Sequence, residues 1–280
     1  MNEKALRTLE YHKIIDLLVR HANCDAAKKR CKKLTPMTSL ADIETAQRQT
    51  ADALSRIFKK GSLSFLGVHD VTASMKRLEI GASLSIEELL HLASLLEVAK
   101  RAKAYSRNDR TEEAETSDSL DEFFDGIEPL TPLLEEIRRC IISSDEISDD
   151  ASSGLKAVRR SMKGMQDKIH SQMNSILNSA SASGLLQDNV ITMRNGRYCL
   201  PVKSEYKNQV SGMVHDQSST GSTLFIEPLA VVNLNNELKE LYLKEQEEIE
   251  KILADLSNLV SEYLSLIHIS APTRLRRISY

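Results

Sequence analysis

Apolar residues recur every three or four positions along most of this chain, which is the spacing of amphipathic α-helices. Residues 3–35 predict a first helix that ends before Pro36, because the residue preceding a proline disfavours helical geometry. Its buried face is predicted to consist of five apolar residues: Leu6, Leu9, Ile14, Leu17 and Leu18. The chain is therefore expected to begin in a helical region.

Cap residues predict the limits of two further helices. Ser39 or Asp42 is suited to open a helix that runs to Lys60, and Gly61 is suited to end it. Ser85 and Glu88 have the spacing of a capping box, which predicts a helix running towards Tyr105. A shorter helix is predicted from Pro129 and Pro132 to about Ile142.

Two narrower apolar seams follow, and each contains one extra residue between its halves. The first consists of Leu155, Val158, Met162, Met165, Ile169, Met173 and Ile176. The second consists of Leu234, Leu238, Leu241, Ile249, Ile252, Leu256, Leu259 and Tyr263. Residues 151–184 carry five basic and one acidic side chain, whereas 233–263 carry three basic and eight acidic ones. We expect the two helices to pair with each other, antiparallel, as an arm of about 45–50 Å.

The segment between the two seams has a β pattern. Apolar or alternating runs occur at 191–193, 197–203, 210–215 and 224–228, and Asn195-Gly196 is a strong hairpin signal. Thr220-Gly221-Ser222 predicts another turn. A small antiparallel sheet of three or four strands is expected at the end of the helical arm.

Composition and charge narrow the class of protein. The 280 residues are 41% hydrophobic, 28% charged and 4% aromatic, with no Trp, which suits packed helices. No run of about 18 apolar residues and no signal-peptide core occurs, so we expect a cytoplasmic protein without a membrane partner. Four scattered cysteines, Cys24, Cys31, Cys140 and Cys199, indicate reduced buried thiols and neither a zinc site nor disulfides. The acidic stretch 106–126 predicts a loop or weak helix, with a solvated connector favoured over a regulatory role.

The β segment is locally basic. Between positions 189 and 215, Glu205 is the single acidic residue, whereas four residues are basic: Arg194, Arg197, Lys203 and Lys207. They are candidates for phosphate-backbone contacts, and their alternative role is to keep an exposed sheet soluble. His215 and Asp216 lie near Ser218 and Ser219, but neighbouring residues rarely reach the geometry of a catalytic triad. We therefore expect no catalytic residue here, and we expect His215, Asp216 and Gly221 to shape a turn. No phosphate-binding loop motif and no metal-ligand spacing occurs, so neither a cofactor nor a metal is expected in these residues.

Three stretches of this region resemble the second bacterial MutS subfamily, the anti-recombination paralogue of the mismatch-repair ATPases. They are residues 196–206, residues 214–228 from Val-His-Asp-Gln to Ile-Glu-Pro, and Leu234-Asn-Asn. Thr8-Leu-Glu-Tyr-His-Lys-Ile-Ile, Arg77-Leu-Glu-Ile-Gly and Asp149-Asp-Ala-Ser are similar to the N-terminal region of that subfamily. The resemblance covers residues 1 to about 263.

The resemblance implies a mainly α fold in which two long antiparallel lever helices carry a small antiparallel β insert, the clamp. The implied domains are a helical core at 1–150, lever helices at 151–184 and 233–263, and a clamp at 185–232. Residues 264–280 depart from the family pattern and resemble a translated sequencing adapter, so Arg274, Arg276 and Arg277 are not interpreted as a nucleic-acid site.

The resemblance also implies functions for a full-length parent. Such proteins carry an ATPase, which uses ATP and Mg²⁺, and a Smr endonuclease domain, and they form homodimers. They bind branched DNA and suppress recombination, which is the function we expect, with the clamp gripping the nucleic-acid backbone. The alternatives are a ribosome-collision factor that grips ribosomal RNA and a structural coiled-coil adaptor. The chain itself is expected to be inactive as an ATPase.

Overall fold

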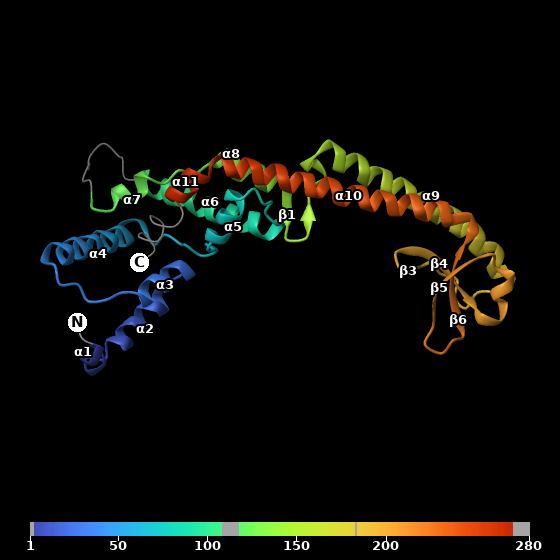
Figure 1. Ribbon diagram of the computed structural model, residues 1–280, viewed down its shortest axis with the longest axis horizontal. Helices are drawn as coiled ribbons and strands as arrows, with labels where there is room; N and C mark the ends of the chain where they lie inside the picture. The colour runs from blue at the N-terminus through green and yellow to red at the C-terminus, as the bar shows by residue number, and fades with distance from the viewer. Residues whose placement is uncertain (1–2, 108–117, 183, 271–280) are drawn as a thin grey trace. The chain divides into compact units, whose positions relative to one another are not determined.

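The computed structural model describes residues 3–107, 118–182 and 184–270. As predicted, the chain is mainly helical with small antiparallel sheets (Figure 1). It divides into two compact units, Met1–Ser148 with Leu253–Tyr280, and Asp149–Ile252. None of the described helices is long and apolar enough to cross a membrane.

The first unit is built from short and medium helices and one small hairpin. Its elements are α1 (Glu3–Thr8), α2 (Tyr11–His21), α3 (Asp25–Lys32), α4 (Leu40–Lys60), α5 (Thr72–Glu79), α6 (Ile86–Arg107), α7 (Asp121–Asp125), α8 (Thr131–Cys140), β1 (Ile141–Ser143), β2 (Glu146–Ile147) and α11 (Leu264–Ser270). The hairpin was not predicted, because its strands are too short for an alternating pattern to show. Residues 271–280 of the predicted adapter-like tail, including its three arginines, lie outside the described residues.

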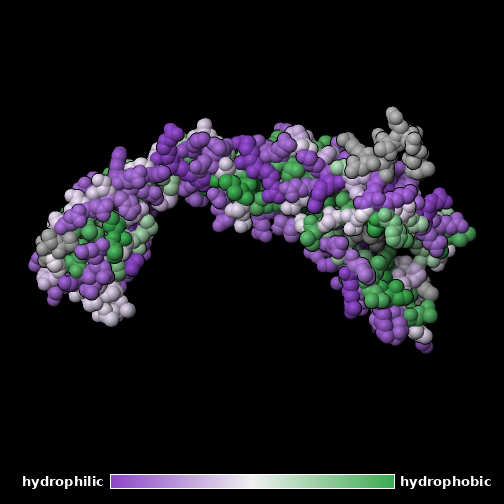
Figure 2. All heavy atoms as spheres, turned by 180° about the vertical axis from the view of Figure 1, so that it is seen from behind, coloured by the Kyte–Doolittle hydropathy of each residue, from purple (hydrophilic) through white to green (hydrophobic). Residues whose placement is uncertain are grey.

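The prediction of one helix over residues 3–35 was wrong, since this stretch forms α1, α2 and α3. Glu10 has a φ of 52°, a left-handed conformation that interrupts a right-handed helix. The predicted buried face is also exposed at Leu9 (63%), Ile14 (59%) and Leu17 (55%). Apolar side chains are visible on the surface over these N-terminal helices (Figure 2, lower right). Apolar periodicity identifies a helix face, but it does not supply an element to cover that face.

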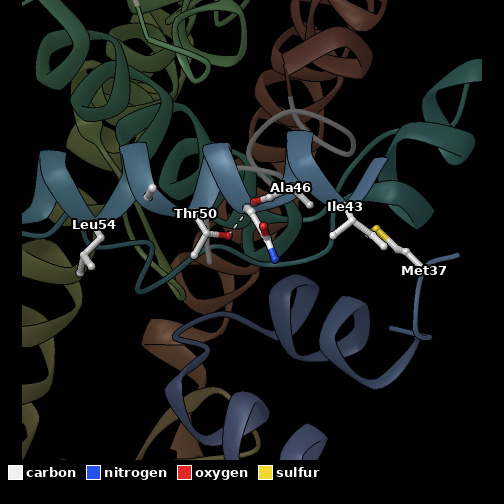
Figure 3. Close-up of a pocket in the computed structure, with 7 residues that line it drawn as sticks. Met37, Ile43, Ala46, Thr50 and Leu54 are labelled. Carbon is white, nitrogen blue, oxygen red and sulfur yellow. Dashed lines mark hydrogen bonds between the residues drawn. The ribbon is translucent and has the colours of Figure 1, made fainter. Parts of the chain in front are cut away.

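Helix α4 begins and ends as predicted. The Ser39 side chain accepts a hydrogen bond from the Asp42 backbone N–H at 3.5 Å, and Gly61 follows the last turn with a φ of 81°. One side of the helix, together with Met37 before it, lines an open and mostly apolar hollow (Figure 3), whose lining residues are Met37, Ile43, Ala46, Gln47, Thr50, Ala51 and Leu54.

The core of the first unit is centred on α6. The predicted capping box is present: Ser85 N–H donates to Glu88 Oε2 at 2.9 Å, and Glu88 N–H donates to Ser85 Oγ at 3.3 Å. Leu89 and Leu92 are fully buried on this helix. Near its start, the Leu84 N–H donates to the Ser257 hydroxyl at 2.8 Å, so residues from the end of the chain complete this core.

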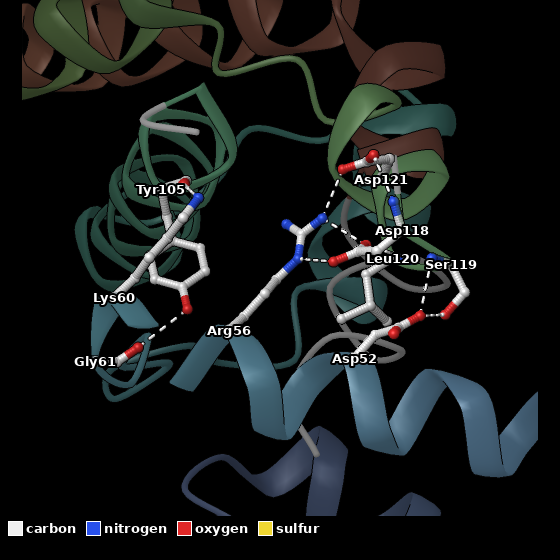
Figure 4. Close-up of polar contacts among 9 residues, drawn as sticks. All are labelled: Asp52, Arg56, Lys60, Gly61, Tyr105, Asp118, Ser119, Leu120 and Asp121. Carbon is white, nitrogen blue, oxygen red and sulfur yellow. Dashed lines mark hydrogen bonds and ion pairs between the residues drawn. The ribbon is translucent and has the colours of Figure 1, made fainter. Parts of the chain in front are cut away.

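An arginine anchors the end of the acidic stretch predicted as a connector (Figure 4). The Arg56 guanidinium contacts Asp118 at 2.5 Å and Asp121 at 2.6 Å, and its own side chain is 8% exposed. Ser119 Oγ donates to Asp52 at 2.5 Å. Residues 108–117 lie outside the described residues, but residues 118–125 are a structured part of the unit and not a solvated loop.

The second unit consists of two long helices and a four-stranded sheet. Its elements are η1 (Asp149–Ala151), α9 (Ser153–Ala182), β3 (Thr192–Arg194), β4 (Arg197–Lys203), η2 (Ser204–Gln209), β5 (Gly212–Gln217), β6 (Thr223–Pro228) and the part of α10 (Leu229–Glu262) up to Ile252. The sheet joins the end of α9 to the start of α10 (Figure 1). At 1.5 Å per residue, the 30 residues of α9 span about 45 Å.

The two helices pair antiparallel, as predicted. Arg159 Nε contacts Glu245 Oε1 at 2.7 Å, and Gln166 Nε2 contacts the Tyr242 hydroxyl at 3.3 Å, so positions rise on one helix as they fall on the other. The expected pairing along the whole of both seams was wrong. Residues from Leu253 onward belong to the first unit, where Ser257 is bound, because an apolar seam does not by itself select its partner.

The sheet has the strand order β3-β4-β6-β5 and is antiparallel throughout. Asn195 and Gly196 both have positive φ, as the tight turn of the predicted β3-β4 hairpin requires. Leu200, Val202 and Ile226 are buried against α9 residues Ile169 and Met173 and α10 residues Val231 and Leu238. One core therefore joins the sheet to both helices.

Candidate nucleic-acid interface

The four basic residues predicted as phosphate contacts occupy different environments in the β segment. Arg194 and Arg197 flank the tight turn between β3 and β4, Lys203 ends β4, and Lys207 lies in η2. The structure therefore does not bring all four together in one patch, and each is described by its own contacts.

Arg197 points into the structure. Its Nη1 contacts Glu227 Oε1 at 2.7 Å, its Nη2 donates to Asn236 Oδ1 at 2.5 Å, and its side chain is 19% exposed. Glu227 is completely buried, and it also contacts His215 Nε2 at 2.5 Å and Asn235 Nδ2 at 2.7 Å. We call Arg197, His215, Glu227, Asn235 and Asn236 the Glu227 cluster. A buried carboxylate with these partners is a structural centre.

Arg194 lies across an aromatic ring. Its guanidinium carbon is 4.0 Å from the centroid of Phe225, and its Nε is 3.3 Å from Asp216 Oδ2. The Arg194 side chain remains 38% exposed, so its outer edge is open to solvent. Stacking of this kind holds a guanidinium in place without using all of its donors.

The two lysines lie near the end of β4. Lys203 Nζ donates to the Gly184 carbonyl at 3.1 Å and lies 6.0 Å from the ring centroid of Tyr206. Lys207 is exposed, and its ammonium group has no ion pair or hydrogen bond within the part of the chain that the structure describes. Lys207 is therefore the predicted contact that is most available to a ligand.

A turn rich in hydroxyl groups, Ser218–Ser222, lies beside Lys203. Lys203 stands opposite Thr223 in the β4-β6 register, and the Ser204 N–H donates to the Ser222 carbonyl at 2.9 Å. The hydroxyls of Ser218, Thr220 and Ser222 form a chain with spacings of 3.4 and 2.8 Å. The sequence predicted a turn at Thr220-Gly221-Ser222 and raised Ser218 and Ser219 only as triad candidates, but it did not predict the position of this turn beside the lysine, which the strand register determines.

The three residues predicted to shape the turn have distinct contacts. His215 belongs to the Glu227 cluster, and its backbone carbonyl accepts from Asn195 Nδ2 at 3.2 Å. Asp216 pairs with Arg194, and its Oδ1 also accepts the Gln217 N–H at 2.8 Å. Gly221 has a φ of 74° and accepts from Gln217 Nε2 at 3.1 Å. The His215 side chain thus contacts Glu227, whereas the Asp216 side chain contacts Arg194.

Cys199 adjoins the same cluster on β4 and is fully buried. Burial, followed by the charge of Glu227, raises the pKa of its thiol to about 11.

Within the described residues, no group of three or more His, Cys, Asp or Glu side chains is placed to hold a metal ion.

We expect Cys199 to resist alkylation in the native chain at pH 8. Because its pKa rises from about 8.5 in an unfolded chain, the fold favours the neutral thiol. This contribution to stability is complete below about pH 8.5 and is lost as the pH rises through about 11. Mass spectrometry of the Cys199 peptide after iodoacetamide treatment, with and without urea, measures the protection. Equal rates in the two samples would contradict the burial.

Comparison with known proteins shows what this chain is similar to. No protein-family model matches the chain. An endonuclease MutS2 of Agathobacter rectalis is 58% identical over 261 residues, which are 93% of this chain and 33% of that protein. The endonuclease MutS2 of Lachnoclostridium phytofermentans is 59% identical over 265 residues, with the same two coverages. That of Clostridioides difficile is 43% identical over 262 residues, covering 94% of this chain and 33% of the relative.

The chain thus spans about one third of the length of the curated relatives that it matches. The matches extend over nearly all of this chain, and the names of these relatives agree with the resemblance of the motif segments. The chain is therefore similar, over nearly all of its length, to about one third of each of these proteins named endonuclease MutS2.

Proposed function

We propose that this chain is a nucleic-acid-binding part of a MutS2-type protein, and that its β segment, the clamp, contacts the phosphate backbone of branched or structured DNA. The observation that carries the proposal is that Lys203 ends β4 and Lys207 lies exposed in η2, which follows that strand. Within the described residues the Lys207 ammonium group has no ion pair or hydrogen bond, and Lys203 adjoins the Ser218–Ser222 hydroxyls. Ammonium and hydroxyl groups are common donors to phosphate oxygens and carry no sequence preference.

Arg194 is the third contact in this proposal. Phe225 and Asp216 hold its guanidinium in one orientation, while its side chain stays partly exposed. A donor that is already oriented loses less conformational entropy when it binds an anion. Arg197 is not proposed as a phosphate contact. Its role is structural, because Glu227 and Asn236 occupy its guanidinium nitrogens.

Other functions are proposed only for a whole MutS2-type protein. The word endonuclease belongs to the names of the relatives, and ATP hydrolysis with Mg²⁺, homodimerisation and suppression of recombination follow from the resemblance. In that setting, α9 and α10 would be levers that carry movement to and from the clamp. We propose a cytoplasmic location for the same parent.

Replacing both Lys203 and Lys207 with glutamine should weaken binding to a four-way DNA junction. Each lost phosphate contact removes about 0.9 from the slope of log K against log salt concentration, so the double variant should lose about 1.8. Fluorescence anisotropy with a labelled junction at several salt concentrations measures this slope. A double variant with Lys239→Gln and Lys244→Gln, at two exposed positions of α10, provides the charge-matched control.

An unchanged slope in the double variant would refute the two lysines as phosphate contacts. Co-sedimentation of the same variants with collided ribosomes gives the second readout. Loss of ribosome association with unchanged junction binding would instead assign the lysines to ribosomal RNA.

A further inference from the structure

The segments that carry the family resemblance converge on the Glu227 cluster. Arg197 follows the tight turn of residues 195–196, His215 lies in the Val-His-Asp-Gln stretch, and Glu227 lies in Ile-Glu-Pro. Asn235 and Asn236 come from Leu-Asn-Asn on α10. Phosphate contact does not account for these residues, because their side chains bind one another.

Asn235 also completes the hydrogen bonding of β4. The β4-β6 ladder pairs Leu200 with Ile226, and the next hydrogen-bonding pair, two residues further on, would join Tyr198 to Pro228. Proline has no N–H and cannot donate to the Tyr198 carbonyl. The Asn235 side chain takes this place, since its Nδ2 donates to Tyr198 O and its Oδ1 accepts from Tyr198 N–H, both at 3.4 Å.

The contacts of the sheet with α10 are therefore directional and buried. Separating them would break four hydrogen bonds: those of Asn235 to Glu227 and to both backbone groups of Tyr198, and that of Arg197 to Asn236. Buried polar groups left without partners are costly, so the sheet cannot turn on α10 without breaking several bonds at once. In addition, Pro228 passes directly into the first residue of α10, and the Leu229 N–H donates to Ser211 O at 3.1 Å.

Helix α9 contacts the same sheet in another way. Its Ile169 and Met173 belong to the apolar core, and the His170 ring meets Tyr198 edge-on at a centroid distance of 5.0 Å. Apolar contact is non-directional and tolerates small shifts of one surface over another. A connection of several residues separates α9 from β3, and its Leu185 and Gln187 bond to the backbone of β4, whereas no residue separates β6 from α10.

We propose that the Glu227 cluster fixes the clamp sheet to α10, so that the sheet and the first turns of α10 move as one body while α9 can shift along the sheet. The cluster is thus a conformational device within the arm. Movement of α10 would reorient the whole sheet, and movement of α9 would do so less. This inference concerns mechanical coupling and stands whether or not Lys203 and Lys207 bind phosphate.

Distances between pairs of spin labels in the whole 280-residue chain test the proposal. One label is placed at Met213→Cys on β5 and the other at either Glu240→Cys on α10 or Lys168→Cys on α9, all at exposed positions. The native cysteines are buried, which directs labelling to the introduced ones. We expect the distribution of sheet-to-α9 distances to be at least twice as wide as that of sheet-to-α10 distances.

Glu227→Gln should widen the sheet-to-α10 distribution at least twofold, and Asn235→Ala should widen it with the ion pairs intact. Glu237→Gln, an exposed carboxylate on the same helix, is the matched control and should change nothing. Circular dichroism verifies that each variant is folded. If Glu227→Gln does not fold, comparison of the sheet-to-α9 and sheet-to-α10 distance distributions in the wild type still tests the proposal. Equal widths for α9 and α10 in the wild type, or an unchanged width in folded Glu227→Gln and Asn235→Ala, would overturn the proposal.

Discussion

Replacing Arg197 with methionine should destabilise the second unit by about 3–5 kcal/mol, because it leaves a buried carboxylate without its main cation. Glu227 is 0% exposed, and Arg197 Nη1 lies 2.7 Å from it, whereas His215 and Asn235 would remain as weaker partners. Urea unfolding, followed by hydrogen exchange of the amides in β4 and β6, measures the loss of stability in this unit specifically. Simple phosphate contact by Arg197 predicts almost no change in stability.

A double-mutant cycle separates the charge from the packing. Arg197→Met combined with Glu227→Gln removes both charges, so its cost should be well below the sum of the two single costs. Arg160→Met, at an exposed position of α9, is the matched control and should change stability by less than about 0.5 kcal/mol. Additive costs in the cycle would show that the two side chains do not interact energetically.

Gly212→Ala should destabilise the same unit by about 3 kcal/mol, at the upper end of the range for overpacking. An added Cβ would lie 2.6 Å from Ile226 Cγ2 and still closer to the carbonyl oxygen of Glu227. The backbone of β5 must therefore move away from β6, beside the buried carboxylate. Chemical denaturation measures the loss of stability, and exchange in the β5-β6 ladder locates it.

Gly164→Ala is the matched control for this substitution. Gly164 lies within α9 with nothing within 4 Å of an added Cβ, so alanine should stabilise the chain by about 0.5–1 kcal/mol through helix propensity. The change in stability on substitution by alanine is therefore expected to have opposite signs at Gly212 and Gly164. A neutral Gly212→Ala would mean that the β5-β6 spacing adjusts freely.

Local signals in the sequence predicted the elements whose geometry depends on neighbouring residues. The Ser85 and Glu88 pair, the glycine after α4 and the Asn195-Gly196 turn all act within four residues, and the structure confirms each. The four-stranded sheet followed from alternation of apolar positions. By contrast, the helix predicted over residues 3–35 is interrupted at Glu10, where no proline or glycine marks the break.

Contacts between distant residues decided the candidate site. The local sequence around a basic residue in a strand does not show whether its side chain faces solvent or a buried acid. Arg197 and Lys207 were therefore grouped together, although one binds Glu227 and the other is exposed. The hydroxyl turn was predicted, but its position beside Lys203 was not, since only the strand register determines that position.

By itself, the sequence determined that this chain is mainly helical, that two oppositely charged helices pair antiparallel, and that a small sheet joins them. These features follow from periodicity, caps and turns, which act over a few residues. Only the tertiary structure decided that the second seam divides between two units and that Arg197, His215, Glu227, Asn235 and Asn236 meet. The physical reason is that the buried charge of Glu227 requires partners, and these come from positions up to 30 residues away along the chain.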